Sequence, residues 1–215
     1  MARSLGLVLD LSFAGFVAVT DGDGNALAAR WRAPGERHDA VSDWVESCLG
    51  EAQGNFSDLI WICVGIGPGS FTGIRIAMAF AQGLAMPGDL PLYGFTSFGP
   101  LLLSAEVHAG ECPVAAIPAN SGRLYAASGL KDPGALIDAE SLSRFATPET
   151  VLIIPAVVPA MDPVLPKFSR VYALEDRWNV PALVRHARDG GKDASRPYYL
   201  QLSAAEEKLG AGAAR

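Results

Sequence analysis

The sequence predicts an α/β or α+β protein with mixed sheets, arranged as a first lobe over residues 1–108 and a smaller second lobe over 109–215. Three observations support this prediction. The chain opens with strand patterns separated by a turn instead of a helix, which indicates an antiparallel meander. A continuous apolar strand, a glycine-rich turn and an apolar helix follow. A strand–turn–strand pattern then begins again at residue 110, which indicates the second lobe.

The composition limits the classes of function. Half of the 215 residues are hydrophobic and 19% are charged, which is typical of a soluble protein with a substantial core. Binding of nucleic acid by one chain alone needs a basic surface, and the net charge of −6 argues against it, though not against tRNA held by a complex. The longest uncharged stretches are short and contain Pro and Gly, so we expect no membrane association.

The three cysteines, Cys48, Cys63 and Cys112, lie far apart and form no CxxC pair. Cys48 and Cys63 fall in apolar runs and are expected in the core. A catalytic thiolate or a disulfide is the alternative. The odd number of cysteines and the lack of a signal peptide predict a reducing, cytoplasmic location.

The first lobe is predicted element by element. Residues 5–12, 13–20 and 26–33 read as three strands, and the Asp-Gly-rich segment 21–25 is a turn signal. Apolar residues at i, i+3, i+4, i+7 and i+8 from Val41 predict an amphipathic helix that begins near His38. The further elements are a buried strand over 59–64, a helix over 72–86, a strand over 91–95 and a helix over 97–107.

The second lobe is predicted with fewer elements. Residues 113–118 and 124–130 read as strands on either side of a turn at 120–123. Residues 151–155 form another strand and 182–187 a helix, while the small and polar tail over 204–215 is expected to fray.

The glycine-rich segment 67–73, which we call the glycine turn, supports two interpretations. Glycine permits positive φ, and successive N–H groups at Gly67, Gly69 and Ser70 can converge on an anion. Ser70 or Thr72 can cap the helix, whose N-terminus favours negative charge, and Arg75 lies in its first turn. The turn is therefore either a phosphate or nucleotide contact or a tight connection between strand and helix.

Two motifs that would give the turn a catalytic role are absent. A Walker phosphate-binding loop needs a lysine after its glycines, and no lysine precedes Lys131. A nucleophile elbow needs Gly-x-Ser-x-Gly, which the residues around Ser70 do not match. Asp10, with Ser12 after it, ends the first strand, where an acid can orient a metal or water beside a phosphate or simply cap a turn. The three histidines show no metal-ligand spacing. We expect no catalytic residue and no metal site.

The helix after the turn is apolar on most sides. Small residues recur every fourth position from Gly69 to Ala85, beside a bulky row of Ile76, Phe80 and Leu84, which predicts burial all round. The second covering layer is either the chain's own first helix or another protein. The partner interpretation assigns ten residues to the interface: Val41, Trp44, Val45, Cys48, Gly73, Ile76, Ala77, Phe80, Ala81 and Leu84. Burial in the chain's own core is the alternative.

Several segments carry a resemblance to a known family: Leu-Val-Leu-Asp-Leu-Ser at 7–12, Arg-His at 37–38, and Gly-Ile-Gly-Pro-Gly-Ser-Phe-Thr-Gly-Ile-Arg-Ile at 65–76. Ala-Gln-Gly-Leu-Ala at 81–85 and Arg-Pro-Tyr-Tyr-Leu at 196–200 fit too. These segments resemble the bacterial TsaB (YeaZ) family of tRNA threonylcarbamoyladenosine biosynthesis subunits. The resemblance is strong over 5–98, weak over 110–190 and partial at the end.

The resemblance implies a two-lobed actin-like (ASKHA) fold with a shortened second lobe and a non-catalytic scaffold role. Family members pair with the catalytic paralogue TsaD, which carries the metal-binding histidines, and with the ATPase TsaE. Their complex transfers a threonylcarbamoyl group from its adenylate to the adenosine 3′ of the anticodon in tRNAs reading ANN codons. The helices corresponding to 38–52 and 72–86 form a bundle with the partner, and the same surface can form a homodimer. No tightly bound cofactor is implied; ATP or ADP at the partner interface stays open.

The chain also departs from the family pattern. Asp10-Leu11-Ser12 replaces the usual Asp-Thr-Ser, and the stretch 118–125 lacks the acid and the first arginine of the family's second-lobe motif. Both departures weaken nucleotide binding by this chain alone. An active ASKHA-type small-molecule kinase or a glycoprotease-like enzyme is the alternative function.

Overall fold

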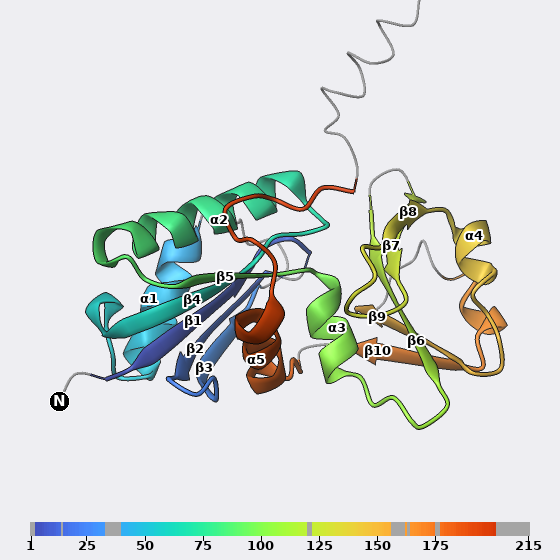
Figure 1. Ribbon diagram of the computed structural model, residues 1–215, viewed down its shortest axis with the longest axis horizontal. Helices are drawn as coiled ribbons and strands as arrows, with labels where there is room; N and C mark the ends of the chain where they lie inside the picture. Colours follow the sequence, from blue (N-terminus) through green and yellow to red (C-terminus); the bar gives the residue numbers. More distant parts are fainter. Residues whose placement is uncertain are drawn as a thin grey trace, which may run out of the picture.

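The computed structural model describes residues 3–13, 15–32, 40–119, 122–155, 162, 164–174 and 177–200. Two five-stranded mixed sheets lie side by side (Figure 1), with strand orders β3-β2-β1-β4-β5 and β10-β9-β6-β7-β8. The predicted α/β architecture with mixed sheets is therefore confirmed. The predicted helix start at 38, the turn residues 120 and 121, and the tail 204–215 lie outside the described residues.

The first sheet contains β1 (Leu5–Asp10), β2 (Phe16–Asp21), β3 (Ala26–Trp31), β4 (Leu59–Gly65) and β5 (Leu92–Phe95). Antiparallel pairing of β1 with β2 and of β2 with β3 confirms the predicted meander. β1, β4 and β5 pair in parallel, so their carboxyl ends meet at one edge of the sheet. Functional sites of open α/β sheets are commonly built at such an edge.

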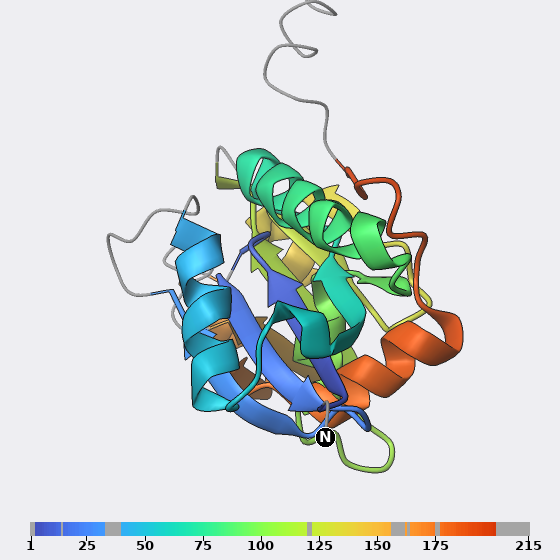
Figure 2. The same cartoon turned by 90° about the vertical axis from the view of Figure 1, so that its left-hand side faces the viewer.

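Helices cover both faces of this sheet (Figure 2). α1 (Val41–Glu51) and α2 (Phe71–Ala85) pack on one face, together with Leu7 and Leu9 of β1. α5 (Val180–Gly190) packs on the other face, which includes Val8 of β1. Successive side chains of a strand point to opposite faces, so a continuously apolar strand such as β1 can contribute to both cores.

The second sheet contains β6 (Cys112–Pro118), β7 (Leu124–Ala127), β8 (Ala135–Ile137), β9 (Thr150–Pro155) and β10 (Arg170–Leu174). Its described helices are short: α4 (Ala139–Ser143) and three residues of 3₁₀ helix at Leu165–Lys167. β8, α4 and β10 were not predicted from the sequence. Each has five residues or fewer, and the β10 side chains at the sheet edge alternate between partly buried and exposed before the buried Leu174.

Two segments connect the lobes. α3 (Phe98–Ser104) packs against both α5 and the second-lobe strand β6 (Figure 1). After α5 the chain runs back along α2; we call residues 191–200 the strap. α5 follows residue 108 in the chain, and its apolar face packs on the first sheet. The boundary near residue 108 stays a proposal.

The strap is tied to both lobes. Gly94 of β5 and Lys192 exchange two backbone hydrogen bonds of 3.1 and 2.9 Å, and the Tyr198 N–H donates to the Ile66 carbonyl at 2.8 Å. The Tyr198 hydroxyl donates to the carbonyl of Pro133 in the second lobe at 2.7 Å. Across the ranges that the structure describes, no helix has both the length and the apolar character needed to cross a membrane.

Candidate functional site

The glycine turn connects β4 to α2 in very little space. Gly67 has φ +107°, and a Cβ there would lie 2.7 Å from the Tyr198 carbonyl oxygen of the strap. A Cβ at Gly69 would overlap the Ser12 carbonyl oxygen, and one at Gly73 would overlap that of Leu11. Glycine is required at these positions because backbone from β1, α2 and the strap meets here. The peptide bond between Gly67 and Pro68 is cis.

Ser70 fixes the start of α2. Its Oγ accepts a hydrogen bond from the Gly73 N–H at 3.2 Å, and its own N–H donates to the Ser12 carbonyl at 2.6 Å. The predicted N-cap is therefore confirmed at Ser70, and Thr72 lies exposed in the first turn. With its first turn bound to the loop after β1, α2 leaves the sheet at a fixed position.

A buried polar cluster lies beneath the turn. Asp10 is fully buried; its Oδ1 accepts from the Ser12 N–H at 2.9 Å, whereas Oδ2 has no hydrogen-bond partner among the described residues. Burial raises the pKa of Asp10 to about 6. The hydroxyls of Ser12 and Ser97 form a hydrogen bond of 2.7 Å. The Asp10 carboxyl occupies the space that a Cβ at Gly65 would fill. The ends of β1, β4 and β5 thus share one polar cluster.

The predicted phosphate contacts consequently fall into separate groups. Asp10, Ser12 and Gly67 are buried under the turn, so they are not at the surface. Ser70, Thr72 and Arg75 are exposed at the start of α2, and Gly69 is partly buried. A phosphate contact in this conformation is therefore open only to the exposed group.

Arg75 has partners on α2 and on the strap. Its guanidinium carbon lies 3.7 Å from the centroid of the Phe71 ring, and its Nε donates to the Tyr199 hydroxyl at 3.2 Å. The Phe71 and Tyr199 rings stack with centroids 4.9 Å apart. The strap therefore holds the first turn of α2 from the side, and Arg75 belongs to that contact.

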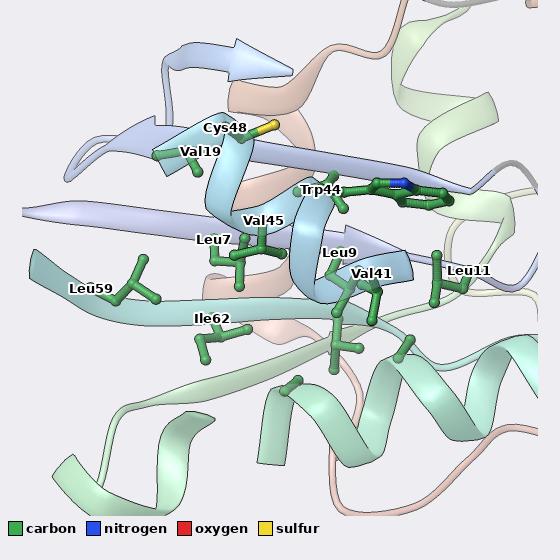
Figure 3. Packing of buried hydrophobic residues seen from close by; sticks show 14 of the residues in the cluster. Leu7, Leu9, Leu11, Val19, Val41, Trp44, Val45, Cys48, Leu59 and Ile62 are labelled. Carbon is green, nitrogen blue, oxygen red and sulfur yellow. The ribbon is translucent and has the colours of Figure 1, made fainter. Parts of the chain in front are cut away.

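Most of the residues predicted to bind a partner lie in the chain's own core. Figure 3 shows Val41, Trp44, Val45 and Cys48 of α1 packed over Leu7 and Leu9 of β1. All four α1 residues are buried, and so are Gly73, Ala77 and Ala81 of α2. Only Ile76, Phe80 and Leu84 are partly exposed. The small residues that recur every fourth position of α2 let the helix pack closely on its own sheet, in agreement with burial in the chain's own core.

The outward surface of the two helices is made of other residues. On α2 it comprises Thr72, Arg75, Ala79 and Gly83, followed by the C-cap residue Met86, all spaced three or four apart. On α1 it comprises Asp43, Glu46, Ser47, Gly50 and Glu51. We call these residues the outer face of α1 and α2. The exposed residues of α2 were not predicted, because Ala79 and Gly83 are not polar. Their spacing of three or four residues was the one signal that could have indicated a common face.

Gly50 and Gly83 are unusual within this face. A Cβ built at either glycine meets no atom within 4 Å. Glycine inside a helix is less stable than alanine by about 1 kcal/mol. Nothing in the described chain requires glycine at these two positions.

The two buried cysteines have raised pKa values, so both thiols are protonated at pH 7. Burial raises the pKa of Cys48 to about 11 and that of Cys63 to about 12, as befits the predicted core thiols. Among the described residues, no three His, Cys, Asp or Glu side chains lie close enough to hold a metal ion together. His38 falls outside the described ranges.

Known proteins are similar to this chain in sequence and in fold. The family model for TsaD, described as tRNA N6-adenosine threonylcarbamoyltransferase, matches residues 35–162, more than half of the chain. The curated relatives that match carry the name TsaB. The chain belongs to the TsaB/YeaZ family. The Escherichia coli protein, named tRNA threonylcarbamoyladenosine biosynthesis protein TsaB, is 32% identical over 130 residues, which are 60% of this chain and 56% of that protein.

A second relative and two solved structures extend the comparison. The Haemophilus influenzae protein of the same name is 42% identical over 65 residues, 30% of this chain and 28% of the relative. Both matches therefore span less than two thirds of the relatives' length. A Pseudomonas aeruginosa crystal structure described as similar to peptidase YEAZ has a TM-score of 0.68, with 24% identity, and covers 92% of this chain and all of that one. YeaZ from the same organism has a TM-score of 0.67 at 24% identity, covering 90% of this chain and 100% of that one.

These matches identify the fold. The two mixed sheets, their likeness to the YeaZ structures and the TsaD-type family match confirm the predicted actin-like (ASKHA) architecture.

Proposed function

We propose that this chain is a non-catalytic scaffold and activator subunit in tRNA threonylcarbamoyladenosine biosynthesis. It pairs with a catalytic TsaD paralogue through the outer face of α1 and α2. The family membership supports the process. Gly50 and Gly83, two exposed glycines on the outer face of α1 and α2, support the choice of surface together with the apolar hollow beside Gly83. The complex, together with the ATPase TsaE, transfers a threonylcarbamoyl group to the adenosine 3′ of the anticodon in ANN-decoding tRNAs. We place this work in the cytoplasm, with tRNA bound only through the complex.

The argument for the surface begins with Gly50 and Gly83. Each costs the isolated chain helix stability, and no neighbour in the described chain requires the missing Cβ. A helix from another protein can approach closely where a side chain is lacking, as small residues allow in tight helix pairs. One glycine on each of two neighbouring helices supports a partner that crosses both.

The surroundings of Gly83 fit such a contact. Gly83 borders a hollow of about 380 Å³ that is lined by Phe56, Leu84 and Leu90 among others. Met86, at the end of α2, is 80% exposed, although methionine gains from burial. An apolar side chain of the partner can fill the hollow while Met86 packs against the partner's surface.

Charge on the outer face differs between the helices. α1 presents Asp43, Glu46 and Glu51, whereas Arg75 is the only charged residue of α2. A matching partner is therefore basic opposite α1 and apolar opposite α2. Such complementarity raises the association rate and makes it dependent on salt. A homodimer would place the acidic helices near one another, so the heterodimer is favoured.

The glycine turn holds α2 in a fixed position for the proposed interface. Ser70, Gly73 and the loop after β1 fix the first turn of α2, and the strap holds it through Tyr199. A helix that is held at its start needs little reordering when a partner binds, which reduces the entropic cost of association. Exposed Ser70 and Thr72 leave room for a secondary contact with ATP or ADP at the partner interface.

A binding experiment tests this proposal. We expect Gly83→Arg to abolish co-purification with the TsaD paralogue, because the new side chain occupies the space into which the partner packs. The control is Gly190→Arg, at the exposed end of α5, where a Cβ also meets no atom within 4 Å. Unchanged binding by the Gly83 variant, or equal loss in both variants, would show that the outer face is not the interface.

The enzyme alternative has a separate test. A kinase or glycoprotease-like activity would have to use Asp10, which lies buried under the turn. Turnover of ATP or a glycoprotein by the purified chain, lost in Asp10→Ala, would favour the alternative over the scaffold.

A further inference from the structure

A second hollow lies where the two lobes and the strap meet. It has a volume of about 460 Å³, within the range of small-molecule sites. From the first lobe it is lined by Gly94–Thr96, His186 and 189–192, and from the second lobe by Leu130 and Lys131. None of these residues belongs to the glycine turn or to the outer face of α1 and α2.

The lining of this hollow holds two positive charges and one negative charge. The chain has only four lysines, and two of them, Lys131 and Lys192, line it. Asp189 is the one acidic residue in the lining, in a chain whose net charge is −6. His186 adds a ring N–H. Burial lowers the pKa of His186, which favours the uncharged ring, and that ring can donate one hydrogen bond.

The segments that carry the two lysines are anchored in the chain itself. The backbone of Lys192 is bound to Gly94 by the two hydrogen bonds of the strap. Lys131 belongs to a turn that Asp132 closes: its Oδ2 accepts from the N–H and the hydroxyl of Ser128, both at 2.7 Å, and its Oδ1 accepts from the Gly134 N–H at 2.8 Å. Segments fixed in this way lose little freedom when a ligand binds.

We propose that this hollow binds a phosphate monoester of about the size of a nucleoside monophosphate, with Lys131 and Lys192 contacting the phosphate. Lysine ammonium groups are common phosphate ligands. His186 donates a hydrogen bond to the ligand, and Leu130 and the almost fully buried Phe95 are the large apolar residues of the lining. Because Lys131 comes from the second lobe and Lys192 from the strap on the first, the ligand links the lobes. The proposal does not depend on the scaffold function.

Calorimetric titration of the full chain tests it with three probes: adenosine 5′-monophosphate, inorganic phosphate and uncharged adenosine. We expect the monophosphate and phosphate to bind and adenosine not to bind. Lys131→Gln and Lys192→Gln should each weaken monophosphate binding by about tenfold or more, because each removes a charged hydrogen bond. The matched control is Lys167→Gln on the 3₁₀ helix of the second lobe, an exposed lysine outside the lining, which should leave the affinity unchanged.

The outcomes are decisive either way. All three lysines are exposed, so the variants should fold, which a thermal melt verifies. No binding of either phosphate probe at millimolar concentration overturns the proposal. Equal weakening by Lys167→Gln, or binding of adenosine as tight as that of the monophosphate, overturns it too, since the phosphate would then not be recognised by the two lysines.

Discussion

Two glycines of the same helix should respond to alanine in opposite ways. Gly83 is exposed near the end of α2, and a methyl group there meets no atom within 4 Å. Gly83→Ala should therefore raise the free energy of unfolding of the isolated chain by about 0.5–1 kcal/mol, the helix preference of alanine over glycine. For a chain of this size, that corresponds to a rise of roughly 1–4 °C in Tm.

Gly73, two to three turns earlier, should show the reverse. Its Cβ would overlap the Leu11 carbonyl oxygen, a backbone atom held by the sheet. The overlap should outweigh the helix preference and lower the free energy of unfolding by about 1–3 kcal/mol, the range for overpacking. Urea unfolding of the wild type and the two variants gives both values. A destabilised Gly83→Ala would refute the claim that no described neighbour requires this glycine; a stabilised Gly73→Ala would refute the close contact between α2 and the loop after β1.

Further predictions concern the buried acid and the strap. The pKa of Asp10 is raised above its unfolded value of 3.8 to about 6, so the cost of burying its charge is absent below about pH 4 and complete above about pH 6. The free energy of unfolding of the wild type should fall by about 3 kcal/mol as pH rises through this interval, and that of Asp10→Asn should not. Urea unfolding at pH 4 and pH 7.5 measures both. The same pH dependence in the two proteins would contradict the raised pKa of Asp10. Gly65→Ala should lower the free energy of unfolding by about 1–3 kcal/mol, because a Cβ there overlaps the Asp10 carboxyl, and a wild-type urea midpoint would refute that contact. Tyr198→Phe removes the hydroxyl bond to Pro133 and should cost about 0.5–1 kcal/mol, with faster amide exchange over 128–134; unchanged exchange would show that the bond does not hold the lobes.

Much of the first lobe could be predicted because its signals are local. The apolar run 59–64 became β4, and the i, i+3, i+4 pattern from Val41 became α1. The turn chemistry of Asp21 predicted the hairpin, and the structure shows its Oδ1 accepting from the N–H groups of Asp23 and Asn25. Periodicity and turn residues act over a few positions, so a single sequence contains them.

The orientation of α2 could not be predicted in the same way. Ala77 and Ala81 are buried, whereas Ala79 and Gly83 are exposed, and small residues carry no polarity to separate the two faces. The partner interpretation therefore assigned Ala77 and Ala81 to the interface, although this side of α2 packs on the chain's own sheet. The place of Asp10 at the end of a strand could be predicted, but its burial depends on Gly65 of a strand 55 positions away. Such long-range contacts form only when the sheet is assembled.

The most direct test of the scaffold claim is reconstituted threonylcarbamoylation of an ANN-decoding tRNA. The reaction contains the threonylcarbamoyl adenylate, ATP, the TsaD paralogue and the ATPase TsaE, with and without this chain. We predict modification only when this chain is present together with TsaD, no modification by this chain alone, and loss of modification with Gly83→Arg. Equal rates without this chain, or modification by this chain in the absence of TsaD, would contradict the scaffold function.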